Sequence, residues 1–177
     1  MEVNILLWFQ NCVRQEWLTP IMEAISFLGK GGWFFLLTTL VLCINKKTRK
    51  LGFCLVIAIA LEVLINNGIL KPMIHRTRPY IAHADVLHLI GKPETDFSFP
   101  SGHTGIAFAW AYAIYFAKEN KKWGILALCL GVLMAISRMY LGFHYPTDVL
   151  VGFVLGMVCA YFAYVINKKY MNNRLKD

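Results

Sequence analysis

Long apolar blocks separated by short polar clusters dominate the chain. Five blocks are apolar enough to predict membrane-crossing helices, at residues 33–44, 51–70, 104–117, 124–137 and 148–166. The first is expected to extend backwards through "IMEAISFLGKGG". A crossing needs about 20 mostly apolar residues, or somewhat fewer with interfacial flanks. The pattern therefore predicts an all-α, polytopic membrane helix bundle of five to six transmembrane helices.

The N-terminal part, residues 1–30, is expected to form interfacial or partly inserted helices. Trp8, Phe9 and Trp17 stand there among Gln, Asn, Arg and Glu. This mixture is typical of a helix that lies at the membrane interface, and an extra short span is the alternative. A length of 177 residues and the lack of an internal repeat indicate one domain over residues 1–177.

The net charge of +8 does not indicate a nucleic-acid partner, because the basic residues sit in short clusters between apolar blocks. Cytoplasmic loops of membrane proteins carry such clusters. If five spans alternate, eleven of the 18 Lys and Arg residues share one face: Lys46, Lys47, Arg49, Lys50, Lys118, Lys121, Lys122, Lys168, Lys169, Arg174 and Lys176. We therefore expect this face and the C-terminus to be cytoplasmic. The connections after the second span (residues 71–103) and after the fourth span are expected to be extracytoplasmic.

These two outward connections hold the ionisable groups that are candidates for catalysis or ligand binding. They are Lys71, His75, Arg76, Arg78, His103, Arg138, His144 and Asp148. Fixed cations beside histidines and a carboxylate indicate an anion site with acid–base groups, and Arg and Lys suit phosphate. The stretch "FPSGHT" also predicts a helix start, where Ser101 can cap and the amides of Gly102 and His103 can face an anion.

Other site types fit less well. His103, His144 and Asp148 are possible zinc ligands, but three neighbouring cations would repel a divalent ion, so no metal is expected. A serine hydrolase lacks its GxSxG motif here and has no use for so many cations. An anion channel or transporter should carry polar residues through its spans, and few are present.

Three motifs occur in order: "KPMIHRTRP" with the form K-x6-R-P, "PSGH", and "SRMYLGFHYPTD" with the form S-R-x5-H-x3-D. Together they resemble the signature of the type 2 phosphatidic acid phosphatase (PAP2) superfamily of lipid phosphatases. Bacterial acid phosphatases and vanadium haloperoxidases are its soluble relatives. The resemblance covers residues 71–148 by motif, and it implies a PAP2/vanadium-haloperoxidase-like helical core.

The resemblance also implies a role for each matched residue. His144 would be the nucleophile and form a phosphohistidine, with Asp148 holding its other ring nitrogen. His103 would protonate the leaving lipid oxygen and then activate water. The phosphoryl oxygens would be bound by Lys71, Arg78, Ser101, Gly102 and Arg138. Neither a metal nor a cofactor is implied.

The implied function is an integral membrane phosphatase that hydrolyses lipid phosphate monoesters or diphosphates. The candidates are phosphatidic acid, phosphatidylglycerol phosphate, undecaprenyl diphosphate and lipid A phosphates. Many undecaprenyl-diphosphate members have Asp where Gly102 stands here, which favours glycerophospholipid or broad substrates. The partners are thus the substrate lipid and the bilayer, and the oligomeric state stays open. A lipid phosphotransferase with the same site, and less readily an anion transporter, are the alternatives.

Two groups of residues keep open roles. His75 and Arg76 either add positive potential to the site or are solvated at the interface. Glu62 lies inside the second span with Asn66 one turn later on the same face. It is expected either to pack as a hydrogen-bonded residue or to position Lys71 or the fourth span. On either account, Glu62→Gln should keep most activity and Glu62→Leu should lose stability.

Overall fold

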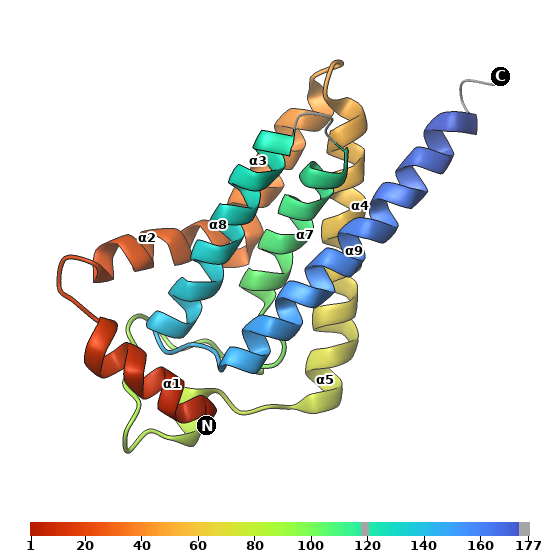
Figure 1. The fold of residues 1–177 in the computed structure, drawn as a ribbon. Helices are drawn as coiled ribbons and strands as arrows, with labels where there is room; N and C mark the ends of the chain where they lie inside the picture. The colour runs from red at the N-terminus through yellow and green to blue at the C-terminus, as the bar shows by residue number, and fades with distance from the viewer. Residues whose placement is uncertain (118–120, 174–177) are drawn as a thin grey trace.

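The computed structural model describes residues 1–117 and 121–173. The described residues form helices joined by short connections and one long irregular loop, with no β-strand among them (Figure 1). Five long helices run side by side. They are α3 (Trp33–Ile44), α4 (Arg49–Ile65), α7 (Gly102–Ala117), α8 (Lys121–Tyr140) and α9 (Pro146–Asn173). The all-α bundle expected from the sequence is confirmed.

Four stretches of the described chain are long and apolar enough to cross a membrane. They are Thr19–Ile44, Arg49–Ala82, Lys121–Tyr140 and Pro146–Lys169. The remaining expected span, residues 104–117, corresponds to α7, which has 16 residues and is not among the four. This helix packs against α4, α8 and α9.

Helix α7 lies very close to α9 because glycines face one another along their contact. A Cβ atom added at Gly156 would lie 2.5 Å from the carbonyl oxygen of Gly105, and one at Gly152 would lie 2.7 Å from the carbonyl oxygen of Ser101. Small residues of this kind let membrane helices approach closely. The contact fixes the start of α7 against the start of α9.

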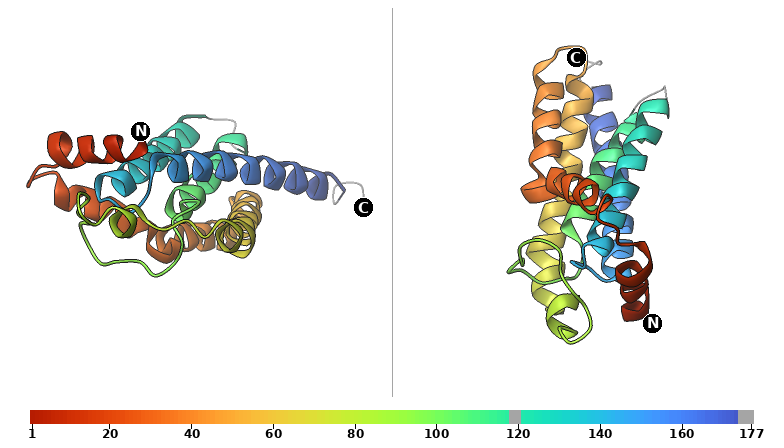
Figure 2. Two further views of the ribbon diagram at one scale, coloured as in Figure 1. Left: turned by 90° about the horizontal axis from the view of Figure 1, so that it is seen from below. Right: turned by 90° about the vertical axis from the view of Figure 1, so that its left-hand side faces the viewer.

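The N-terminal third begins with three short elements, α1 (Glu2–Trp8), a π-helix (Phe9–Val13) and α2 (Thr19–Gly29). A 3-10 turn at Lys30–Gly32 then joins α2 to α3, with positive φ angles of 61° at Gly31 and 71° at Gly32. The apolar block extends backwards as expected, but it bends at these glycines. Helix α2 therefore runs across the long helices instead of along them (Figures 1 and 2).

Helix α4 continues through a π-helix (Asn66–Leu70) into α5 (Lys71–Ile74). This continuation ends at His75, which adopts the left-handed conformation with φ of 50°. A short helix, α6 (Pro79–Ala82), follows. π-Helical turns inside α-helices often mark functional sites, and this one directly precedes Lys71.

The long connection before α7 and the α8–α9 connection lie at one end of the bundle, together with α1 (Figure 1). The α3–α4 turn and the end of α9 lie at the other end. The two polar connections thus share a face, as the sequence predicts. Which side of the membrane that face meets stays a prediction. Of the expected cytoplasmic cations, Lys118, Arg174 and Lys176 lie outside the described residues.

Candidate active site

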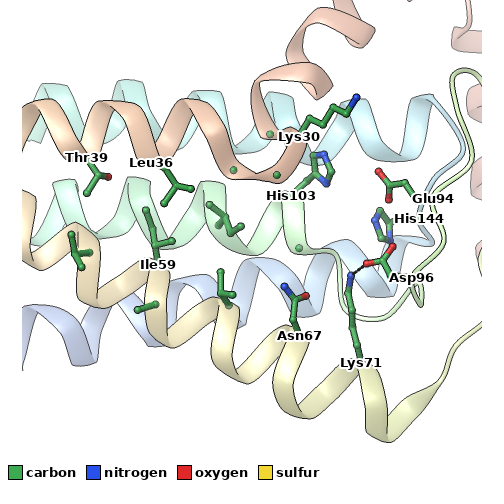
Figure 3. Close-up of a pocket in the computed structure, with 18 of the residues that line it drawn as sticks. Lys30, Leu36, Thr39, Ile59, Asn67, Lys71, Glu94, Asp96, His103 and His144 are labelled. Atoms are coloured by element: carbon green, nitrogen blue, oxygen red, sulfur yellow. Dashed lines mark hydrogen bonds and ion pairs between the residues drawn. The ribbon is translucent and has the colours of Figure 1, made fainter.

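A cavity of about 850 Å³ lies between α3, α4 and the start of α7. Polar and charged groups gather at one end of it, where His103, His144, Asp96 and Lys71 point toward one another (Figure 3). The residues that line this end include Lys71, Arg78, Glu94, Asp96, Gly102, His103 and His144. Five of them were predicted from the sequence as site residues.

His144 sits in the α8–α9 connection and is buried, with 1% of its surface exposed. Its Nδ1 lies 3.5 Å from Oδ2 of Asp148, and its Nε2 lies 3.4 Å from the Arg78 guanidinium. Burial, and then the positive charges of Arg138 and Arg78, hold the pKa of His144 well below its usual range. A neutral ring with its proton on Nδ1, facing Asp148, leaves a lone pair on Nε2.

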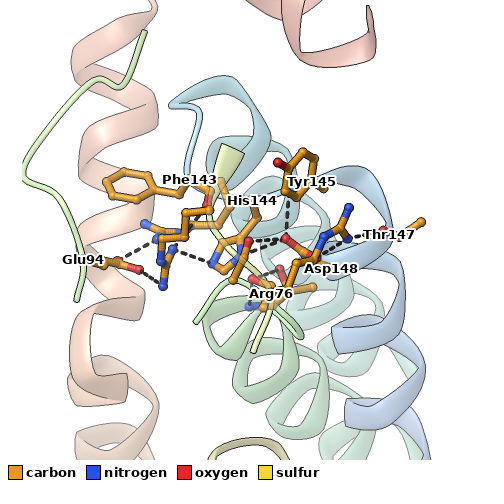
Figure 4. A network of polar contacts seen from close by, with 12 residues as sticks. Arg76, Glu94, Phe143, His144, Tyr145, Thr147 and Asp148 are labelled. Atoms are coloured by element: carbon orange, nitrogen blue, oxygen red, sulfur yellow. Dashed lines mark hydrogen bonds and ion pairs between the residues drawn. The ribbon is translucent and has the colours of Figure 1, made fainter. Parts of the chain in front are cut away.

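Asp148 is fully buried behind His144 and is held by several donors (Figure 4). Its Oδ2 accepts hydrogen bonds from the Ser98 hydroxyl at 2.5 Å and the Tyr145 backbone N–H at 2.9 Å. Its Oδ1 pairs with the guanidinium of Arg76 at 2.6 Å. The carboxylate is therefore fixed in one orientation against the His144 ring.

The three cations of the expected phosphate site are paired with carboxylates of the long connection. Asp96 pairs with Lys71 and, at 2.6 Å, with Arg78. Glu94 bridges Arg78 and Arg138, with both nitrogen–oxygen distances at 2.7 Å. Partial burial alone would raise the pKa of Asp96, but Lys71 and Arg78 lower it from 3.8 to about 2. The carboxylate oxygens thus contact the cations that are expected to bind phosphoryl oxygens.

Arg138 lies near the end of α8 and is 2% exposed. It donates to the Ser26 hydroxyl at 2.6 Å, and its guanidinium lies 3.9 Å from the centre of the Phe143 ring. It does not itself line the cavity but reaches it through Glu94. Helix α2 thereby contributes Ser26 to the support of the site.

The start of α7 is held by its own cap and by α9. The Thr104 N–H donates to the Ser101 hydroxyl at 3.5 Å, and the Ser101 N–H donates to the Asp148 carbonyl at 3.0 Å. Ser101 is buried and lies behind the cavity, whereas Gly102 and His103 line it. A Cβ atom at Gly102 would meet nothing within 4 Å, so that side of the helix start faces free space.

The structure brings all eight predicted site residues into one region. Lys71, Arg78, Gly102, His103 and His144 line the cavity, while Ser101, Arg138 and Asp148 support them from behind. Within the described residues, no group of three or more His, Cys, Asp or Glu side chains is arranged to hold a metal ion.

Sequence reasoning missed three participants, Glu94, Asp96 and Ser98, and it left the role of Arg76 open. All four lie in the connection over residues 71–103, whose polar character was the available signal, but the argument for an anion site did not consider its carboxylates or Ser98. His75, by contrast, is exposed and contacts the Phe97 ring.

The other end of the cavity is apolar and runs between α3 and α4 from Gly32 to Cys43. Eleven residues of helix span about 16 Å. Leu36, Leu40 and Val56 line this part and are themselves 51%, 56% and 46% exposed. The cavity therefore opens sideways, onto the apolar surface of the bundle.

The family model described as the PAP2 superfamily matches residues 47–172, which include every residue of the predicted site. The chain belongs to the PAP2 superfamily. Phosphatidylglycerophosphatase B of Bacillus subtilis is 32% identical over 93% of this PAP2 chain and 82% of its own length. Undecaprenyl-diphosphatase of Sulfolobus acidocaldarius is 32% identical over 81% of this chain and 69% of its own length.

The crystal structure of Aquifex aeolicus LpxE has a similar fold. It superposes with a TM-score of 0.77 at 27% sequence identity and covers 92% of this chain and 93% of the solved chain. The PAP2 family expected from the three motifs is thus confirmed. The relatives and the apolar helices also show a multi-pass protein embedded in a membrane.

Proposed function

We propose that this PAP2 protein is a metal-independent phosphatase of membrane lipid phosphates that works through a phosphohistidine on His144. One observation carries the proposal. His144 and His103 line the polar end of a cavity whose other end is apolar and opens between α3 and α4. A lipid could thus keep its chains in the bilayer while its headgroup reaches both histidines.

In the first half-reaction, Nε2 of His144 attacks phosphorus, and the bond between phosphorus and the lipid oxygen breaks. His103 donates a proton to that oxygen, so that the lipid alcohol leaves as a neutral molecule. Asp148 balances the positive charge that forms on the His144 ring as its Nε2 becomes bonded to phosphorus.

In the second half-reaction, a water molecule attacks the phosphorus of the phosphohistidine. His103, now neutral, takes the proton of this water, and the phosphorus–nitrogen bond breaks. Inorganic phosphate leaves, and His144 and His103 return to their starting protonation states. No metal ion or redox partner is needed to balance either step.

Charge stabilisation would come from the cations that now hold carboxylates. Negative charge spreads over the equatorial oxygens during phosphoryl transfer, so fixed donors around them lower the barrier. Lys71 and Arg78 line the cavity and are the direct candidates. For these cations to contact phosphate, the Asp96 and Glu94 carboxylates must first break their ion pairs with them.

A glycerophospholipid monoester of the phosphatidylglycerol phosphate class is the substrate we propose first. The Bacillus subtilis relative, named a phosphatidylglycerophosphatase, supports this choice, as does Gly102 at the position where many undecaprenyl-diphosphate members have Asp. The distribution of Lys and Arg supports a site on the extracytoplasmic side, with the C-terminus in the cytoplasm.

The test uses the full chain purified in detergent, assayed for phosphate release from phosphatidylglycerol phosphate, phosphatidic acid and undecaprenyl diphosphate in the presence of EDTA. Release should persist with EDTA and be lost in His144→Ala. His88→Ala, an exposed histidine of the same connection that lies outside the cavity, should stay active. Complete EDTA sensitivity restored by zinc or magnesium, or wild-type release by His144→Ala, would contradict the proposal. Product that forms only with an added alcohol would instead indicate a phosphotransferase.

A further inference from the structure

Arg76 contacts the buried carboxylate of Asp148 (Figure 4) and joins it to Glu2 of the N-terminal helix α1. Its Nη1 lies 2.6 Å from Oδ1 of Asp148, and its Nη2 lies 2.6 Å from Oε2 of Glu2. Nη1 also donates to the Thr147 hydroxyl at 2.7 Å. The guanidinium carbon lies 3.9 Å from the centre of the Tyr145 ring, which packs on its flat face.

Asp148 has a particular need for this contact because its side chain has no exposed surface. Ionised side chains that are buried without a counter-charge are strongly unfavourable. Its Oδ2 is held by neutral donors, the Ser98 hydroxyl and the Tyr145 backbone N–H. Among the ion pairs of the described residues, Asp148 pairs with Arg76 and His144, and only Arg76 carries a permanent charge.

The geometry of the guanidinium matters as much as its charge. One planar group reaches two carboxylates that come from opposite ends of the sequence, Glu2 on α1 and Asp148 on α9. A guanidinium presents its donors in a rigid fork, whereas a lysine ammonium is a single point charge on a flexible stem. Arg76 therefore fixes the position of the Asp148 carboxylate as well as its charge.

Glu2 completes the arrangement from the other side. Its Oε1 accepts from the backbone N–H of Thr147 at 3.1 Å and from the Thr147 hydroxyl at 2.5 Å. Partial burial opposes ionisation of Glu2, but Thr147 and Arg76 hold its pKa below the usual value. Glu2 thus lies at the N-terminus of α9, where a negative charge is favourable, and anchors the second half of the Arg76 fork.

We propose that Arg76 is a positioning residue of the phosphatase reaction. Anchored by Glu2, it holds the Asp148 carboxylate against Nδ1 of His144 and so sets the rate at which Nε2 attacks phosphorus. The N-terminal helix α1 is then part of the active site through Glu2. This inference rests on the proposed phosphohistidine mechanism.

The role predicts a specific kinetic signature. Arg76 does not line the cavity, whereas Lys71 and Arg78 do. Loss of Arg76 should therefore lower kcat and leave KM nearly unchanged, because substrate binding does not involve its side chain. Loss of Lys71, by contrast, should also raise KM.

The experiment measures kcat and KM for phosphatidylglycerol phosphate in detergent for Arg76→Gln, Arg76→Lys, Glu2→Gln and the Glu2→Gln/Arg76→Gln double variant. Arg76→Gln should lower kcat by about 10- to 100-fold, which is less than the roughly 10⁴-fold that complete loss of an orienting carboxylate can cost. KM should change by less than about twofold. Arg76→Lys should retain an intermediate kcat, because it keeps the charge without the fork.

The Glu2 variants test whether the N-terminal helix acts through Arg76. Glu2→Gln should lower kcat by about three- to fivefold, and the double variant should match Arg76→Gln, since coupled residues are not additive. Arg49→Gln is the matched control for charge. It removes an arginine at the far end of α4, whose guanidinium contacts the Cys43 carbonyl, and should keep the wild-type kcat.

Three results would overturn the inference: a wild-type kcat in Arg76→Gln, a loss confined to KM, or losses of Glu2→Gln and Arg76→Gln that simply multiply. If Arg76→Gln does not fold, Arg76→Lys and Glu2→Gln test the inference in its place. A lower kcat with a nearly unchanged KM supports it, and a wild-type kcat or a change confined to KM overturns it. A wild-type protein without phosphate release would instead overturn the proposed function. An active wild type with an unaffected Arg76→Gln overturns only the role of Arg76.

Discussion

Replacing Asp96 with asparagine should improve substrate binding. The Asp96 carboxylate pairs with Lys71 and Arg78, the two cations that line the polar end of the cavity. A phosphoryl group that binds them must first displace this carboxylate. Asparagine keeps the size of the side chain and removes its negative charge, so the cations become more available to phosphate.

The size of the effect follows from the pKa of Asp96. A value lowered from 3.8 to about 2 corresponds to about 2 kcal/mol of net stabilisation of the Asp96 carboxylate, after the opposing effect of burial. The side chain is 51% exposed, so solvent screening reduces the usable part to about 1 kcal/mol. At 1.4 kcal/mol per tenfold, this predicts a KM about fivefold lower in Asp96→Asn.

The same change should make the protein about 1 kcal/mol less stable at neutral pH. Because the pKa of Asp96 is lower in the folded protein, its stabilising effect is fully present above pH 3.8 and is lost as the pH falls through about 2. At pH 7 Asp96 is therefore fully ionised in the wild type, and an assay at this pH compares a full negative charge with the uncharged side chain of Asp96→Asn.

The assay measures phosphate release in mixed micelles for the wild type, Asp96→Asn and the control Asp85→Asn. Asp85 is an exposed carboxylate of the same connection and lies outside the cavity. Asp85→Asn should leave KM unchanged. A KM for Asp96→Asn that is unchanged or higher would refute the reasoning, because the carboxylate would then not compete with the substrate.

Three further predictions follow from buried groups. The acid limb of kcat/KM should lie below pH 6.5, because burial and nearby cations hold the pKa of His144 below that value; a limb above pH 6.5 would contradict this. Glu62 accepts from the Asn66 amide at 2.7 Å, so Glu62→Gln should keep most activity and Glu62→Leu should lose about 1–3 kcal/mol of unfolding free energy. If Glu62→Leu and the wild type were equally stable in thermal unfolding, the Glu62–Asn66 hydrogen bond would not contribute to stability. Gly156→Ala should lower the free energy of unfolding by about 1–3 kcal/mol, because its Cβ would lie 2.5 Å from a backbone oxygen of α7. The control Gly68→Ala should lower it less. Equal melting temperatures of the two variants would argue against the close contact between α7 and α9.

Features encoded locally were predictable from the sequence. Apolar blocks of sufficient length predicted the bundle, and spacing within three motifs predicted which polar residues meet. The bend before α3 also had a local signal, "GKGG", because Gly31 and Gly32 can adopt the positive φ angles that the turn requires. The length of the apolar block that contains α2 and α3 suggested one continuous helix, but length alone does not show where the chain changes direction.

Contacts between distant parts of the chain were not predictable in the same way. Glu2 and Arg76 are separated by 74 positions, and no periodicity or motif links them. Their contact depends on where α1 lies after the whole bundle has formed. The pairing of Glu94 and Asp96 with the phosphate-site cations depends likewise on the path of an irregular connection.

The central claim is that phosphate passes through His144, and isolation of the phosphoenzyme tests it most directly. Wild-type protein would be mixed with phosphatidylglycerol phosphate labelled with ³²P in the phosphomonoester, quenched in alkaline detergent and digested. The account predicts label on the peptide that contains His144, stable to base and lost in acid, and no label in His144→Ala. Phosphate release by an active wild type without any labelled histidine, or label on a residue other than His144, would contradict it.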